Sequence, residues 1–290
     1  MKTHITIPFF IPHEGCINQC VFCNQGRISG RTSPVEPSAV RATVLKYIEG
    51  IPSGTIVEAA FFGGSFTAIP ADRQEALLNE AFACLREGLI SNIRLSTRPD
   101  CIDTGVIERL SRYGVRTVEL GAQSFDDEIL IRSKRGHSRA DIFRASDLLV
   151  RGGFELVLQL MIGLPGETPS TIRESAASAA SLSPAGVRIY PTLVVAGTEL
   201  AKLFESGEYI PLSMDKAIAY SAELISFFEL KGIRVLRTGI HPMEHAEESV
   251  IAGPYHPAFG FLARSRVRRN ELEKILPRSA SSSHGKICIA

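Results

Sequence analysis

Short apolar runs that alternate with longer segments of helical spacing restrict the fold of this chain more than any other feature. The apolar runs are rich in β-branched residues and have the length of strands. They lie at residues 5–11, 55–62, 92–96, 117–120, 155–162 and 187–192. The helical segments lie at residues 38–49, 71–87, 104–113, 139–151, 168–180 and 198–205. This alternation predicts parallel strands joined by right-handed crossovers.

A doubly wound sheet and a curved barrel both satisfy such a pattern. The nearly regular spacing, about 30 residues per unit, favours the barrel. A further helix at residues 213–231 and a strand at 233–237 follow the six units. We therefore predict an α/β fold: a partial (β/α)6 barrel over residues 1–212, with a C-terminal extension over residues 213–290 that packs on it.

Residues that begin and end helices flank several of these segments. Asp103 and Thr168 have the side chains of N-caps. Gly50, Gly88 and Gly114 stand where helices are expected to end.

Composition and charge exclude several classes of protein. Hydrophobic residues make up 44% of the 290 residues and charged residues 22%, as in globular proteins. The net charge of +1 gives no global attraction to nucleic acid or membrane, so a nucleic-acid partner must meet a local patch. No apolar run reaches the roughly 18 residues that span a bilayer. We expect a cytoplasmic protein with reduced thiols and no membrane partner.

Polar and glycine-rich residues follow five of the predicted strands. These segments are residues 16–23, 63–66, 96–100, 121–124 and 163–167. In a barrel of parallel strands, the carboxyl ends of all strands meet at one face, where such proteins carry out chemistry. We expect the functional site at this face.

Three of the six cysteines fall within eight residues. Cys16, Cys20 and Cys23 have the spacing C-x3-C-x2-C, and three thiolates on one loop can converge on a soft metal centre. A closed zinc or iron–sulfur site needs four ligands, so a [4Fe–4S] cluster held by three cysteines keeps one iron open to a ligand. Cys84 and Cys101 lie in apolar stretches typical of core thiols.

Other interpretations of the cysteine cluster stay open at this point. His13, three residues before Cys16, could complete a structural zinc site. Cys288 could also supply a fourth ligand, from the far end of the chain. A disulfide with one spare thiol conflicts with a reducing compartment. A chance cluster would bind no metal.

The cysteine spacing, with Phe22 directly before the third cysteine, resembles the signature of the radical S-adenosylmethionine (SAM) superfamily. The resemblance covers roughly residues 4–262 and implies a full or six-unit partial β/α barrel. It also implies a [4Fe–4S] cluster on Cys16, Cys20 and Cys23, with SAM chelating the fourth iron through its amino and carboxylate groups. In that family an electron from the cluster, supplied by a low-potential donor such as ferredoxin or flavodoxin, cleaves SAM to methionine and a 5′-deoxyadenosyl radical.

Further segments carry the same resemblance. Gly63, Gly64 and Ser65 resemble the family's glycine motif, which binds the SAM amino group, and glycine permits close backbone approach to a ligand. Residues 119–126 resemble oxygen-independent coproporphyrinogen oxidases and the Elongator catalytic subunit. Residues 162–168 resemble the superfamily's fifth strand end.

The resemblance also implies roles for single residues around SAM. Gln123 would reach the ribose or methionyl group, Arg135 would pair with the carboxylate, and Phe22 would contact the adenine. Ser96 and Gln159 stand where coproporphyrinogen oxidases carry acidic SAM contacts, so carboxylate recognition of the ribose does not carry over.

The chain also resembles short bacterial proteins of the Elongator-catalytic-subunit-like group. Residues 189–193, 197–200 and 253–260 carry this likeness. The Elongator subunit has a different cysteine spacing and an additional acetyltransferase domain, so the likeness does not imply acetyl transfer. We expect a radical SAM enzyme acting on an unidentified substrate, with a tRNA base as the candidate.

Two other functions fit the sequence. One is a non-catalytic protein of the same fold that binds an iron–sulfur cluster, SAM or haem, and the other is a zinc-bound adaptor. The basic run at residues 264–269 could meet RNA phosphates or form a solvated helix face.

Overall fold

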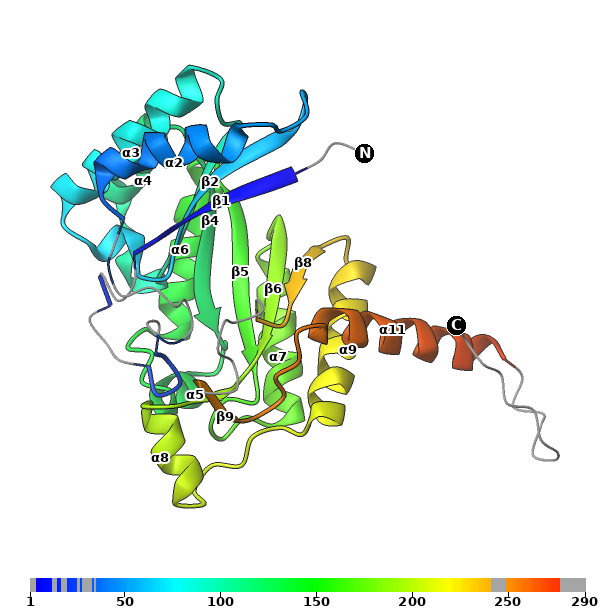
Figure 1. Cartoon of the computed structure of the whole chain (residues 1–290). Coiled ribbons are helices and arrows are strands. Elements are labelled where there is room, and N and C mark those ends of the chain that lie inside the picture. Colours follow the sequence, from blue (N-terminus) through cyan, green and yellow to red (C-terminus); the bar gives the residue numbers. More distant parts are fainter. Residues whose placement is uncertain are drawn as a thin grey trace, which may run out of the picture.

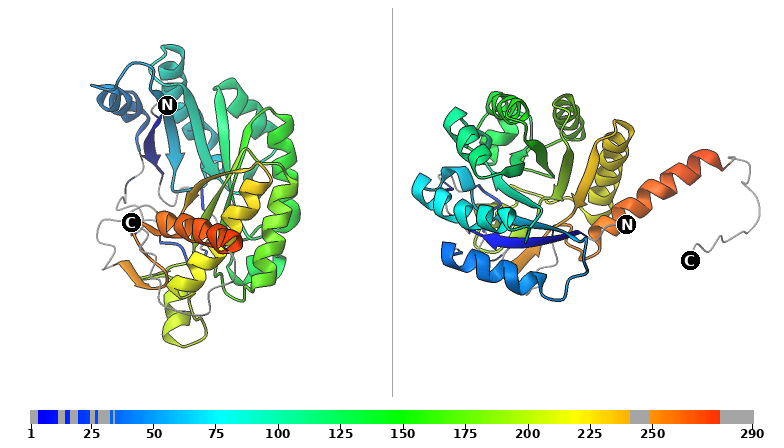
Figure 2. Two further views of the ribbon diagram at one scale, coloured as in Figure 1. Left: turned by 90° about the vertical axis from the view of Figure 1, so that its right-hand side faces the viewer. Right: turned by 90° about the horizontal axis from the view of Figure 1, so that it is seen from above.

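Seven parallel strands form one curved sheet in the computed structural model, which describes residues 4–11, 15–16, 20–24, 27, 33, 35–240 and 249–276 (Figure 1). In spatial order the strands are β1 (His4–Phe10), β2 (Ile56–Phe62), β3 (Asn92–Thr97), β4 (Val115–Gln123), β5 (Glu155–Ile162), β6 (Gly186–Pro191) and β8 (Arg234–Thr238). Strands β1 and β8 are the two edges of the sheet. Seen from above, the sheet curves inside an arc of helices, which confirms the predicted α/β partial barrel (Figure 2).

Helices cover the outer face of this half-barrel. They are α2 (Pro37–Ile48), α3 (Ala71–Arg86), α4 (Thr104–Arg112), α6 (Arg139–Arg151), α7 (Pro169–Ser181) and α9 (Met214–Leu230). Successive side chains of each strand point to opposite faces of the sheet, so every second residue faces the helices, and these residues are mostly apolar. Phe61, Leu120 and Ile189 are fully buried in this core together with Leu77 and Phe228 from the helices.

The alternate positions of the strands carry a buried network of charges. In it, Arg94 of β3 bridges two carboxylates: its Nη1 lies 3.0 Å from Glu58 Oε2, and its Nη2 donates to Glu119. Arg188 of β6 lies 2.8 Å from Glu119 through its Nε. Burial opposes the charge of Glu58, but hydrogen bonds from Asn92 and Arg94 outweigh burial and lower the pKa of the Glu58 carboxyl. A buried carboxylate is tolerated when partners of this kind surround it.

The ends of several helices form as the sequence predicts. Asp103 accepts a hydrogen bond from the Val106 amide at 2.8 Å, and Thr168 caps α7. Gly50, Gly88 and Gly114 all have positive φ angles at helix ends. Five elements were not predicted: α5 (Asp127–Arg132), the 3₁₀ helices η1 (Phe66–Ala68) and η2 (Pro99–Cys101), and the small antiparallel pair β7 (Val194–Val195) and β9 (Val250–Ala252).

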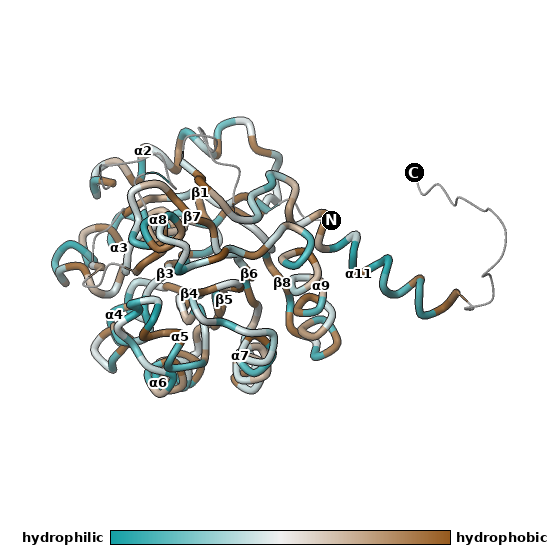
Figure 3. Tube along the Cα trace, turned by 90° about the horizontal axis from the view of Figure 1, so that it is seen from below, coloured by the Kyte–Doolittle hydropathy of each residue, from teal (hydrophilic) through white to brown (hydrophobic). Residues whose placement is uncertain are grey.

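The region expected as an extension contributes to the main sheet. Strand β8 pairs with β6 and becomes the seventh strand. Helix α8 (Glu199–Glu205) follows β7. Helix α11 (Phe259–Ile275), anticipated only as a helix face at residues 264–269, packs on α9 and β8 before it projects from the body of the molecule (Figure 3). The domain division at residue 212 stays a prediction. No helix among the described residues is long and apolar enough to cross a membrane.

Candidate functional site

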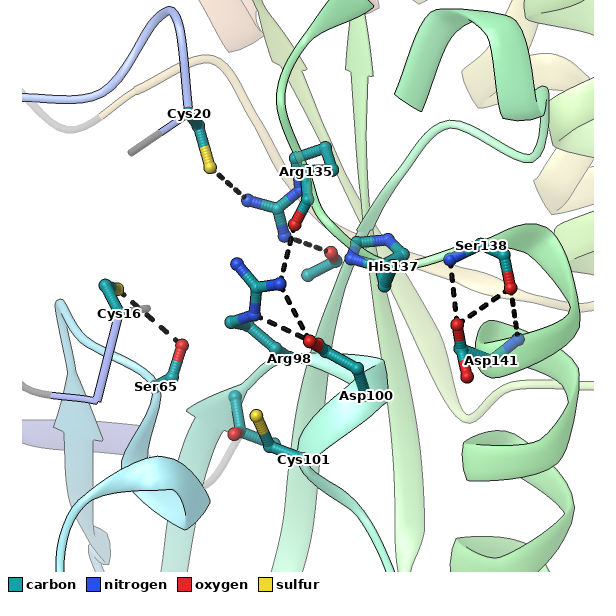
Figure 4. A network of polar contacts seen from close by, with 12 residues as sticks. Cys16, Cys20, Ser65, Arg98, Asp100, Cys101, Arg135, His137, Ser138 and Asp141 are labelled. Carbon is teal, nitrogen blue, oxygen red and sulfur yellow. Dashed lines mark hydrogen bonds and ion pairs between the residues drawn. The ribbon is translucent and has the colours of Figure 1, made fainter. Parts of the chain in front are cut away.

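The cysteine loop packs against the glycine-rich end of β2. Gly15 has a φ of 70°, and a Cβ atom there would lie 2.3 Å from the carbonyl oxygen of Ser65. Only glycine permits this approach of the two backbones. Cys16 Sγ lies 3.7 Å from Ser65 Oγ (Figure 4). Gly63, with a φ of 102°, starts the turn that presents Ser65. The structure therefore places two of the predicted motifs, the cysteines and Gly63-Gly64-Ser65, side by side.

A buried arginine contacts the second cysteine. Arg135 Nη1 donates to Cys20 Sγ at 2.9 Å, and its Nη2 donates to the Gly121 carbonyl at 2.6 Å. Arg135 is 6% exposed. A Cβ atom on Gly121 would lie 3.2 Å from Arg135 Nη2 and 3.0 Å from the Gln123 side chain, so glycine at the end of β4 makes room for both.

A second buried arginine holds the first in place. Arg98 Nη2 donates to the main-chain carbonyl of Arg135 at 2.6 Å. The same guanidinium is bound by Asp100, at 3.0 Å from Nε and 2.8 Å from Nη2 (Figure 4). Burial alone would lower the pKa of Arg98, but the Asp100 carboxylate raises it, so the guanidinium stays charged. In the described part of the chain, Arg135 itself forms no ion pair with a carboxylate.

His137 lies two residues after Arg135 and is neutral near pH 7. Burial lowers the pKa of its imidazole to about 4, and the nearby Arg135 acts in the same direction. Its Nε2 lies 3.2 Å from the Ala122 carbonyl and donates to it in the neutral ring, while the buried Nδ1 has no hydrogen-bond partner among the described residues. A proton added at Nδ1 would therefore be unpaired.

Both Cys84 and Cys101 were expected to be core thiols, and this is correct for Cys84 but not for Cys101. Cys84 is fully buried in the core, as expected of a structural thiol. Cys101 instead lies in η2, partly exposed, beside Arg98 and Asp100 at the site face. The reason is the short 3₁₀ turn after β3, which brings residue 101 back toward the strand ends. Burial, assisted by the Asp100 charge, raises the pKa of the Cys101 thiol to about 11, so it stays protonated at neutral pH.

Three of the predicted SAM contacts come from the carboxyl-terminal halves of neighbouring strands. Gln123 ends β4 in a left-handed conformation with a φ of 66°, and Gln159 Nε2 of β5 lies 3.3 Å from its Oε1. Ser96 of β3 donates to the Phe61 carbonyl at 3.5 Å. The three side chains thus share the site end of the half-barrel, and their roles toward SAM stay predictions.

Phe22 has a packing role in the structure. It is half-buried and lies between two apolar clusters, one containing Val21 and Val194 and the other containing Met161 and Leu164. This packing ties the cysteine loop to β5 and β7. Its predicted contact with adenine stays a prediction.

The chemistry of the three free cysteines and of the arginine beside them fits an iron–sulfur cluster held by thiolates. Cys16, Cys20 and Cys23 form no disulfide. The buried charge of Arg135, which has no carboxylate partner in the described ranges, calls for an anion beside Cys20. Among the described residues, no three Cys, His, Asp or Glu side chains are grouped so that they could hold a metal ion, and this includes the three cysteines. His13 and Cys288 lie outside the described residues, so their predicted roles are not placed.

Sequence reasoning missed Arg98, Gly121 and His137 as parts of the site. The polar run at residues 96–100 was a signal for Arg98, because it follows a predicted strand. Gly121 stands in a segment whose resemblance was noted, without a reason for the glycine itself. His137 gave no signal, since its burial depends on contacts across β4.

Comparison with known proteins supports the same fold and family. The model of the radical SAM superfamily matches residues 10–179, and that of the radical SAM C-terminal domain matches residues 184–269. A tRNA uridine(34) acetyltransferase of Methanocaldococcus infernus is 28% identical over 267 residues, which cover 77% of this chain and 48% of that protein. The heme chaperone HemW of Bacillus subtilis is 25% identical over 80% of this chain and 61% of its own length.

Solved structures show the same architecture. Elp3 of M. infernus, with an N-terminal deletion, superposes with a TM-score of 0.74 at 22% identity over 94% of this chain and 64% of that one. HemN, the coproporphyrinogen III oxidase of Escherichia coli, gives a TM-score of 0.55 at 20% identity over 80% of this chain and 54% of that one. The chain spans about half the length of the tRNA uridine(34) acetyltransferases that it matches. From the family match over more than half of its residues, the chain belongs to the radical SAM superfamily.

Proposed function

We propose that this protein is a radical SAM enzyme that holds a [4Fe–4S] cluster on Cys16, Cys20 and Cys23. One observation carries the proposal: a buried guanidinium, Arg135, faces the thiol of Cys20 at the carboxyl end of the sheet in a member of this superfamily. When bound, the cluster and SAM supply a 5′-deoxyadenosyl radical that abstracts hydrogen from a substrate.

The chain's own residues would bind and orient SAM. The backbone of Gly63 and Gly64 offers close approach to the amino group, and Ser65 adds a hydroxyl beside Cys16.

Side chains from the other strands would complete the SAM site. Gln123 and Gln159 offer amide groups from two neighbouring strands. Phe22 would lie at the adenine. Ser96 would line the same space from β3. Arg135 is the candidate for the carboxylate, because arginine suits a planar anion.

We propose a tRNA base as the substrate. The support is the set of relatives named tRNA uridine(34) acetyltransferase, which this chain matches over much of its length. A low-potential electron donor such as ferredoxin or flavodoxin is the expected partner. Fold-level likeness does not determine substrate, so profiling of tRNA nucleosides in a deletion strain is the direct test.

A second candidate is a non-catalytic haem-handling protein of the same fold. The match to the heme chaperone HemW over 80% of the chain favours it. Haem binding without formation of 5′-deoxyadenosine would support this candidate over the enzyme.

Metal content tests the cluster. After anaerobic reconstitution we expect about four irons and four sulfides per chain, as for a [4Fe–4S] cluster. Cys20→Ala should abolish the cluster, because one of three ligands is lost. Cys84→Ala is the matched control, since this thiol is buried in the core, away from the site. His13→Ala should keep its iron. Unchanged iron in Cys20→Ala would contradict the assignment.

Product analysis tests the activity. The loaded and reduced protein should form 5′-deoxyadenosine slowly from SAM even without substrate. Gly64→Val should lower this rate by crowding the methionyl end of SAM while leaving the iron content unchanged. A loaded, reduced wild type that forms no 5′-deoxyadenosine, with and without total tRNA, would favour the binding protein instead.

A further inference from the structure

We propose that Arg135 is a positioning residue for the reduction of the cluster: its hydrogen bond to the sulfur of Cys20 makes the cluster easier to reduce, whether or not SAM is bound. This inference rests on the proposed function, because it requires that Cys20 is a cluster ligand. It gives Arg135 a role separate from the contact with the SAM carboxylate.

The guanidinium is fixed at both of its ends. Nη1 donates to Cys20 Sγ at 2.9 Å and Nη2 donates to the Gly121 carbonyl at 2.6 Å, so rotation away from the sulfur would break two hydrogen bonds. The Arg135 amide donates to the Leu130 carbonyl at 2.9 Å. The loop after α5 therefore presents this side chain from a hydrogen-bonded turn.

A second layer of contacts keeps the backbone of Arg135 in place. Arg98 donates to the Arg135 carbonyl at 2.6 Å, and Asp100 binds Arg98 through two hydrogen bonds. The cysteine loop is joined to the same turn, because the Val21 amide donates to the Ser133 carbonyl at 3.2 Å. The sulfur and the guanidinium are thus held on segments that are bonded to each other.

Charge explains the direction of the effect. A [4Fe–4S] cluster on three thiolates carries one net negative charge when oxidised, and reduction adds a second. A buried cation attracts the doubly charged form more strongly, because Coulomb interactions are strong where water is excluded. Hydrogen bonds to cluster sulfurs act in the same direction. Among the described residues Arg135 has no carboxylate that would cancel its charge.

The test compares four full-length proteins after anaerobic reconstitution: wild type, Arg135→Gln, Arg135→Lys and Arg132→Gln. Arg132 is an exposed arginine three residues earlier and serves as the matched control for loss of one charge. Iron and sulfide are counted first. The midpoint potential is then measured without SAM by potentiometric titration followed by electron paramagnetic resonance.

We expect equal iron in all four proteins. Arg135→Gln should lower the reduced-to-oxidised ratio at a fixed solution potential by about tenfold, which corresponds to a shift of about 59 mV to more negative potential for one electron. Arg135→Lys keeps the positive charge but lacks the paired Nη donors, so its midpoint potential should lie between those of the wild type and Arg135→Gln. Arg132→Gln should match the wild type.

Three results would overturn the inference. The first is an unchanged potential in a fully loaded Arg135→Gln protein. The second is a difference that arises only after SAM is added, which would assign Arg135 to the carboxylate alone. The third is loss of iron in both Arg135 variants with an intact circular dichroism spectrum, which would make Arg135 an assembly residue. Failure of the wild type to bind iron would instead contradict the proposed function.

Discussion

Buried arginines illustrate how single residues shape this molecule. Arg94, Arg98 and Arg135 are all less than 8% exposed, yet each is anchored by several hydrogen bonds. The sequence could indicate Arg135 through a family resemblance. It could not indicate the burial of Arg98, because its carbonyl partner on Arg135 is 37 residues away and becomes adjacent only in the folded sheet. Such long-range contacts leave no local pattern.

The buried imidazole of His137 should make the free energy of unfolding depend on pH. Its folded pKa of about 4 is below the usual value of about 6.5, so the unfolded chain binds more protons between these values. Stability present above about pH 6.5 should therefore be lost as the pH falls toward 4, by up to about 3 kcal/mol. His137→Gln should flatten this dependence.

Urea unfolding of the metal-free wild type and His137→Gln at about pH 7.5 and about pH 5 measures the difference. Equal losses of unfolding free energy in the two proteins would show that the buried imidazole is not the cause.

Short elements and irregular strand ends are the features that the local sequence pattern does not predict. Helix α5 has only six residues, too few for a helical period, and it depends on the Asp126 side chain, which accepts from the Ile129 amide at 3.1 Å. Strand β4 continues to Gln123, three residues past its predicted end, through a register shift between Leu120 and Gln123. Such a bulge re-aims side chains at a strand end, and this one turns Gln123 toward Gln159.

Helix α11 offers a matched pair of substitutions. Phe259 at its start is 2% exposed and packs with Ala217 and Ile218 of α9, whereas Phe261 is 72% exposed. Phe259→Ala should lower the free energy of unfolding by about 3–5 kcal/mol through the cavity it leaves. Phe261→Ala should change it by less than about 0.5 kcal/mol. Chemical denaturation of both variants measures this, and similar losses would mean that Phe261 is covered in solution.

The whole molecule combines a half-barrel with a projecting helix. Six strand–helix units could be predicted, because each carries its own apolar period. The seventh strand was expected, but its place in the sheet was not, since pairing between β6 and β8 is set by tertiary contacts. Helix α11 is last buried at Val267, and residues 268–276 are exposed on all sides (Figure 3).

Hydrogen exchange should divide α11 into two parts. Amides of residues 259–267 should be well protected, because this half packs on α9 and β8. Amides of residues 268–276 should exchange at least tenfold faster, since a helix without packing opens locally at little cost in free energy. Mass spectrometry of deuterated peptides resolves the two halves. Equal protection would indicate a binding partner on the projecting half.

The two edge strands of the open sheet bear on how copies of this chain meet. Unpaired strand edges invite other chains to add strands, which leads to aggregation. Pro8 lies in the middle of β1 and removes one backbone donor from that edge. At the opposite edge, the exposed Arg234 places a positive charge on β8, and Arg264 of α11 donates to the Val235 carbonyl. Neighbouring copies therefore meet an interrupted row of hydrogen-bonding groups on one side and a charged, partly covered edge on the other, so the half-barrel can stay open without adding further strands.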